Sequence, residues 1–117
     1  MRSVGIATAL LSLVGSAASQ VHLNALYISH SGPDNQEFVE LIGTPGTLLD
    51  GHLVCVIEGD GLAAGTLDRA YNLTGLTIPV SGYFVLGDAA VTPNDFSIGT
   101  SDALENGSET FYLVSTA

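Results

Sequence analysis

The chain has 117 residues, with twelve Asp or Glu against two Lys or Arg, and a formal net charge of −10 at pH 7. A surface this acidic repels phosphate backbones, so direct binding to nucleic acid is disfavoured. The length allows one small domain with a single core.

Residues 1–19 have the three-part pattern of a secretory signal peptide. Arg2 precedes an apolar run over 4–14, and small residues follow at 15–19. The run is shorter than the roughly 20 apolar residues that span a bilayer. We therefore predict a signal peptide at 1–19 and a domain at 20–117 with no later membrane span. The domain is expected to be secreted, or periplasmic in a bacterium; a retained anchor is the alternative.

Period-2 alternation of apolar and polar residues, broken by Gly, Pro, Asp and Asn, predicts strands along the whole domain. The expected strands cover 21–30, 37–42, 52–58, 68–73, 76–78, 83–86, 96–98 and 109–114. Segments 52–58 and 83–86 are mostly apolar and are expected to be central in their sheets. The pattern predicts an all-β sandwich or small barrel of about seven short strands. The core candidates are Phe38, Val54, Val56, Phe84, Leu86, Phe111 and Leu113.

Four segments, in this order, resemble the lamin-tail domain family and in particular its secreted, bacterial-type branch. They are HLNALYI (22–28), EFVELIGTPGTLLDGHLVCV (37–56), LTIPVSGYFVLGD (76–88) and LENGSETFYLV (104–114). The resemblance implies an immunoglobulin-like β-sandwich with no shared catalytic residues, used as an accessory module beside secreted hydrolases or alone. The chain departs from the family pattern at Ala25, where Glu usually follows Asn, and at His52, where Trp often follows Gly.

Glu37 and Glu40 flank an apolar pair and raise the possibility of a catalytic dyad. Residues three apart on a strand point to opposite faces, so the two carboxylates are not expected to converge. Glu37 shares a face with Val39 and Leu41, and Glu40 shares one with Phe38 and Ile42. We predict no catalytic residues and no cofactor.

Neither histidine nor cysteine suggests a metal or catalytic centre. His22, His30 and His52 lack the spacing of a zinc motif, although His30 and Asp34 are near enough to meet across a turn. Cys55 stands alone between apolar neighbours and is expected to be a buried free thiol.

Loop acids leave calcium as the one metal to consider, since calcium prefers several oxygen ligands from flexible loops. The weak candidates are Asp60, Asp88, Asp102 and Glu105. Asn72 and Asn106 each begin an N-glycosylation sequon, which a eukaryotic secretory route could modify, but the resemblance to the bacterial-type branch favours unmodified turn residues.

The leading hypothesis is a secreted, non-catalytic accessory or interaction module, with a protein or a surface glycan as its partner. One alternative is the N-terminal fragment of a larger secreted nuclease or phosphatase, with its catalytic part beyond residue 117. A third is a calcium-dependent adhesion module.

Overall fold

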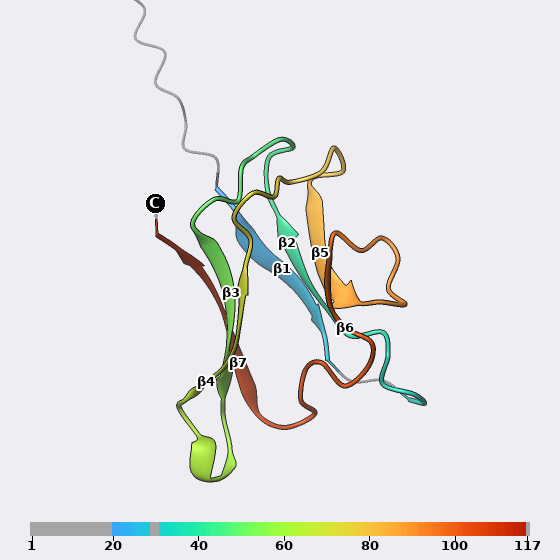
Figure 1. The fold of residues 1–117 in the computed structure, drawn as a ribbon, viewed down its shortest axis with the longest axis vertical. Helices are drawn as coiled ribbons and strands as arrows, with labels where there is room; N and C mark the ends of the chain where they lie inside the picture. Colours follow the sequence, from blue (N-terminus) through green and yellow to red (C-terminus); the bar gives the residue numbers. More distant parts are fainter. Residues whose placement is uncertain (1–19, 29–30, 117) are drawn as a thin grey trace, which may run out of the picture.

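A computed structural model describes residues 20–28 and 31–116. The predicted signal peptide at 1–19 lies outside the described residues, as do residues 29, 30 and 117. Within the described part, seven strands form two sheets that face each other across one core (Figure 1). This confirms the prediction of an all-β sandwich of about seven short strands.

The strands divide into a sheet of four and a sheet of three. The first has the order β1 (His22–Tyr27), β2 (Phe38–Ile42), β5 (Tyr83–Asp88), β6 (Phe96–Gly99), and the second has the order β4 (Leu67–Asn72), β3 (His52–Glu58), β7 (Glu109–Ser115). Neighbouring strands are antiparallel except β5 and β6, which are parallel. The predicted central strands are central in both sheets.

Turn residues set most strand bounds close to the predicted ones. β3 has the predicted bounds, and β2 begins one residue later than expected. The expected strand at 76–78 is not a strand, because only Thr77 pairs there, in a single bridge to Leu48. A 3-10 turn, η1 (Gly61–Ala63), lies in the hairpin between β3 and β4. No helix in 20–28 and 31–116 is long and apolar enough to span a membrane.

The core forms from the inward faces of both sheets. Its fully buried members on β2, β3 and β5 are Val39, Leu41, Val54, Val56, Phe84 and Leu86. Loop residues close the ends of the core: Leu49, Leu73, Ile78 and Leu104. Four of the core candidates are therefore confirmed outright. Phe111 and Leu113 are half-buried and pack against this cluster.

Two burial predictions are wrong because each residue lies on the outward face of its strand. On β2 the inward face belongs to Val39 and Leu41, so Phe38 points outward and is only half-buried. On β3 the inward face belongs to Val54 and Val56, so Cys55 lies on the outer face and is half-exposed rather than buried.

A loop at 89–95 covers part of the outer face of the four-stranded sheet, and Figure 1 shows it standing beside β5. Asp95 fixes the loop to Val85 through two hydrogen bonds. The Val85 N–H donates to Asp95 Oδ2 at 2.8 Å, and the Asp95 N–H donates to the Val85 carbonyl oxygen at 2.9 Å. Asn94 Nδ2 also donates to the carbonyl oxygens of Gly87 and Asp88 at 3.0 and 2.9 Å. These bonds hold the loop against the sheet.

Candidate functional site

Glu37 and Asp88 are the two fully buried charged residues of the described chain. Their backbones pair at the end of the β2–β5 ladder, where Asp88 N–H donates to the Glu37 carbonyl at 2.9 Å. The Glu37 N–H donates to Asp88 Oδ2 at 3.1 Å. Glu37 Oε2 accepts the backbone N–H of Leu104 at 2.8 Å. The Glu37 carboxylate thereby ties the loop before β7 to the four-stranded sheet, and the Asp88 carboxylate fixes the start of β2.

The pKa of Glu37 is raised above its ordinary value of 4.5 because burial removes its carboxylate from water. The Leu104 N–H opposes this shift, whereas the negative charges of Asp34 and Asp88 add to it. Glu37 Oε1 and Asp88 Oδ1 are buried and accept no hydrogen bond within the described chain. A raised pKa at a buried carboxyl is also found at catalytic acids. In this structure the Glu37 carboxylate accepts the Leu104 N–H and the Asp88 carboxylate accepts the Glu37 N–H.

The predicted separation of Glu37 from Glu40 agrees with this arrangement. Glu37 lies on the core side with Val39, and Glu40 lies on the outer face with Phe38. The structure therefore does not bring the two glutamates together.

The four calcium candidates are not gathered into one site. Asp60 Oδ2 accepts the Ser108 N–H at 3.0 Å, while Asp88 bonds to the backbone of Glu37. Asp102 N–H donates to the Asp34 carbonyl at 2.8 Å. The described residues contain no group of three or more His, Cys, Asp or Glu arranged to hold a metal ion.

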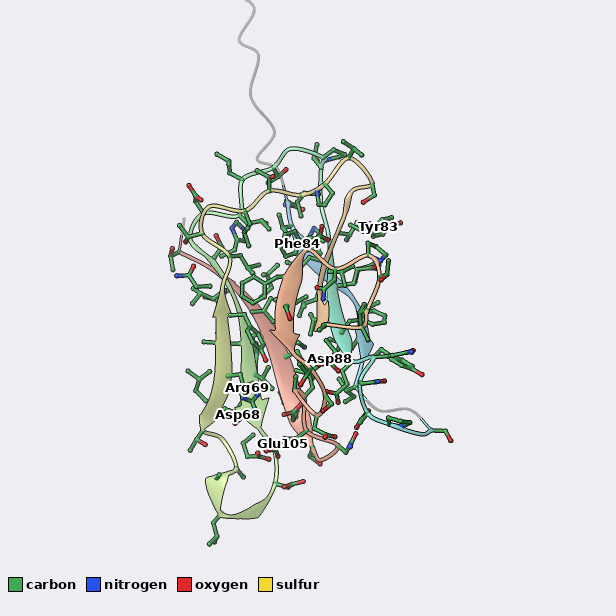
Figure 2. All side chains as sticks on the ribbon, turned by 45° about the vertical axis from the view of Figure 1, so that its right-hand side comes forward. Asp68, Arg69, Tyr83, Phe84, Asp88 and Glu105 are labelled. Atoms are coloured by element: carbon green, nitrogen blue, oxygen red, sulfur yellow. The ribbon has the colours of Figure 1, made fainter. Side chains whose placement is uncertain are left out.

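Glu105 belongs to a different acidic group, at the loop end of the sandwich. The charge of Glu58 raises the pKa of Glu105, and Asp68 adds to that effect. Arg69, whose Nε lies 3.5 Å from Asp68 Oδ2, opposes it. Figure 2 shows Asp68, Arg69 and Glu105 near one another at this end, far along the molecule from Tyr83.

The remaining sequence candidates are dispersed. His22 begins β1 and His52 begins β3, in different sheets, and His30 lies outside the described residues. Asn72 and Asn106 are exposed. Asn72 Oδ1 accepts the Thr74 N–H at 3.0 Å, and Asn106 Nδ2 donates to Asp34 Oδ2 at 2.7 Å.

The outer face of the four-stranded sheet carries a hollow of about 230 Å³, here called the first hollow. It is lined by Phe38, Glu40, Ser81, Tyr83, Val85, Val91, Thr92 and Pro93. Its floor comes from β2 and β5, where Glu40 is paired with Val85 in the ladder. Its wall is the 89–95 loop. The lining is apolar and aromatic apart from the aliphatic hydroxyls of Ser81 and Thr92 and the carboxylate of Glu40.

Glu40 is held in place from β1. Asn24 Nδ2 donates to Glu40 Oε1 at 2.6 Å, and the ladder of β1 and β2 is irregular between Leu23 and Ala25, at Asn24. Within the described chain, no Lys or Arg forms an ion pair with Glu40; the one described ion pair joins Arg69 and Asp68.

A second hollow of about 320 Å³ adjoins the first and shares Phe38, Val91 and Thr92 with it. Its other lining residues are Tyr27, Gln36 and Ala90. The Tyr27 and Phe38 rings stack with their centroids 5.8 Å apart and their planes at 25°. The two hollows thus form one groove that passes over Phe38, here called the outer groove.

Sequence reasoning missed the outer groove, although one signal pointed to it. The residues that share a face with Glu40 on β2 are Phe38 and Ile42, which make an apolar face with one acid. That pattern identifies a second apolar face on the strand, but it does not show which face is buried. Comparison of the chain with protein-family models, with curated proteins and with solved structures found no match in any of the three.

Proposed function

We propose that this chain is a secreted, non-catalytic β-sandwich of lamin-tail type that binds a partner protein in its outer groove. The observation that carries the proposal is the groove itself, whose first hollow is mainly apolar and aromatic and whose second hollow is mixed, on a strongly acidic domain. Concave apolar surfaces with a few fixed polar groups are typical binding sites. Exposed aromatic side chains such as Tyr27 and Tyr83 are enriched at protein interfaces.

The rigid setting of the groove supports binding. Its floor is a pair of hydrogen-bonded strands, and its wall is fixed through Asp95 and Asn94. A surface that is already formed loses little conformational entropy when a partner binds.

The roles of the buried acids support the non-catalytic part of the proposal. Glu37 and Asp88 each bond to backbone N–H groups that hold the fold together. A general acid or base must instead reach a proton of the substrate.

The test is a turnover assay on the purified chain from residue 20, which includes all seven strands. We expect no release of product from nucleic acid, phosphoester or glycan substrates, with and without divalent cations. Turnover that follows the protein through purification would overturn the non-catalytic assignment.

A further inference from the structure

We infer that the first hollow takes the side chain of an arginine, presented by an extended segment of the partner protein. This inference rests on the proposed function and specifies the group that the outer groove recognises. It combines three observations: an unneutralised carboxylate, aromatic and apolar walls, and a volume that suits one side chain.

The carboxylate is the first observation. Asn24 holds Glu40 Oε1, whereas Glu40 Oε2 accepts no hydrogen bond within the described chain. The one Lys or Arg of residues 20–117 is Arg69, on β4 in the other sheet, so the chain does not neutralise this acid itself. A half-buried carboxylate fixed by a neighbour offers a guanidinium a stronger partner than a mobile surface acid does.

The walls are the second observation. Val85, Val91 and Pro93 suit the aliphatic stem of a long side chain, which packs on apolar surface while its charged end reaches a polar group. Phe38 and Tyr83 lie beside Glu40 in the same lining. A planar guanidinium both stacks on aromatic rings and pairs with a carboxylate, which favours arginine over lysine.

The volume is the third observation. At about 230 Å³, the first hollow is smaller than the roughly 300–1,000 Å³ typical of small-molecule sites. A single long side chain fits this space better than a drug-sized ligand does. The second hollow continues the groove over Phe38, so a segment of chain can place a further side chain there. The net charge of −10 favours approach of a basic partner.

The experiment titrates the chain from residue 20 with three acetylated and amidated pentapeptides, followed by heteronuclear NMR at low salt. Their central residues are arginine, its uncharged isostere citrulline, and lysine; free propylguanidinium is a fourth probe. Two variants are compared with the wild type. Glu40→Gln keeps the acceptor for Asn24 but removes the charge, and Glu105→Gln removes one exposed charge from the loop end as the matched control.

We expect the arginine peptide to bind roughly three- to tenfold more tightly than the citrulline and lysine peptides. Glu40→Gln should remove most of this preference for arginine, and Glu105→Gln should keep it. Propylguanidinium should bind more weakly than the arginine peptide, because it lacks a backbone to lie along the groove.

Four outcomes would overturn the inference. Equal affinity for arginine and citrulline would mean that the hollow recognises apolar stems and not charge. Full retention of the arginine preference in Glu40→Gln would place the contact elsewhere, and equal binding of propylguanidinium would point to small free guanidinium compounds, and not a peptide segment, as ligands. Absence of binding by every probe would exclude the first hollow as an arginine site. None of these outcomes resembles substrate turnover, which alone overturns the non-catalytic assignment.

Discussion

The Oε2 atom of Glu37 accepts the backbone N–H of Leu104 at 2.8 Å, which joins the start of β2 to a loop 67 positions later in the chain. Leu104 is itself part of the core and almost fully buried. The Glu37 side chain therefore fixes the approach to β7, while the Glu37 backbone bonds to Asp88 at the end of the β2–β5 ladder.

Replacement of Glu37 tests this connection. Glu37→Ala removes the acceptor, leaves the Leu104 N–H without its partner and opens a small cavity, so we expect a loss of about 2 to 3 kcal/mol in the free energy of unfolding. Glu37→Gln keeps an acceptor oxygen and should lose less than about 1 kcal/mol. Urea unfolding measures both. An exposed control, Glu105→Ala, should leave the free energy of unfolding nearly unchanged. Equal losses for Glu37→Ala and the control would contradict the connection.

The dependence of stability on pH follows from Glu37 and from two other carboxyls with raised pKa values, Glu105 and Glu109. The pKa values of Glu37 and Glu109 are raised chiefly by burial, and that of Glu105 chiefly by the charge of Glu58. The folded chain therefore holds more protons than the unfolded chain between the ordinary value of 4.5 and the higher folded values. The destabilising effect of these groups is absent at pH values below their pKa in the unfolded chain. It is fully present at pH values above their pKa in the folded chain.

We accordingly expect the contribution of these carboxyls to the free energy of unfolding to fall as pH rises from about 4.5 towards neutrality. Glu37→Gln should make the decline shallower, since Gln does not ionise. Urea unfolding of the wild type and the variant at several pH values measures the two slopes. A Glu37→Gln slope equal to or steeper than that of the wild type would contradict this prediction.

Gly87 gives the 89–95 loop the room it needs beside the sheet. A Cβ at Gly87 would lie 2.9 Å from Val91 Cβ, too close for an unshifted loop. We expect Gly87→Ala to cost about 1 to 3 kcal/mol by overpacking and to weaken binding of the arginine peptide, because Val91 belongs to both hollows. Ala89→Ser, at an exposed position within the same loop, is the matched control. Unchanged peptide affinity in a folded Gly87→Ala variant would show that the wall does not contribute to the site.

Calcium is expected to leave the thermal stability of the chain unchanged. The acids suggested by the sequence bond to backbone groups or lie in separate loops, and the described residues offer no three-ligand group. A specific site would raise the melting temperature with the logarithm of the calcium concentration once that concentration exceeds the dissociation constant. Thermal melts in millimolar calcium and in chelator, at matched ionic strength, should therefore have the same midpoint. A midpoint that is higher in calcium and keeps rising with calcium concentration would reinstate a calcium site.

The strands were predictable from the sequence because local alternation and turn residues determine them. β3 has the predicted bounds since apolar residues fill 53–57 and glycines flank the strand on both sides. The face of β2 was not predictable in the same way. Both of its faces are apolar, with Phe38 and Ile42 on one and Val39 and Leu41 on the other, and only the opposing sheet decides which is buried.

The site depends on contacts that local patterns do not contain. The outer groove brings together residues of β2, β5 and the 89–95 loop, which lie some tens of positions apart in the chain. Asp95 could be recognised as a loop residue, but its two hydrogen bonds to Val85 depend on the parallel pairing of β5 with β6 that follows the loop. The alternation correctly groups Glu37 with Val39 and Leu41, but the choice of Phe38 as a core residue assigns that face to solvent, and the burial of Glu37 depends on the opposing sheet and on Leu104.

The most direct test of the account is the position of the bound arginine. Intermolecular nuclear Overhauser effects should be measured on the chain from residue 20 saturated with the arginine peptide. Binding in the first hollow predicts contacts from the arginine side-chain methylene protons to the rings of Phe38 and Tyr83 and to the methyl groups of Val91. Contacts confined to the acidic loop end, near Asp68 and Glu105, would contradict it.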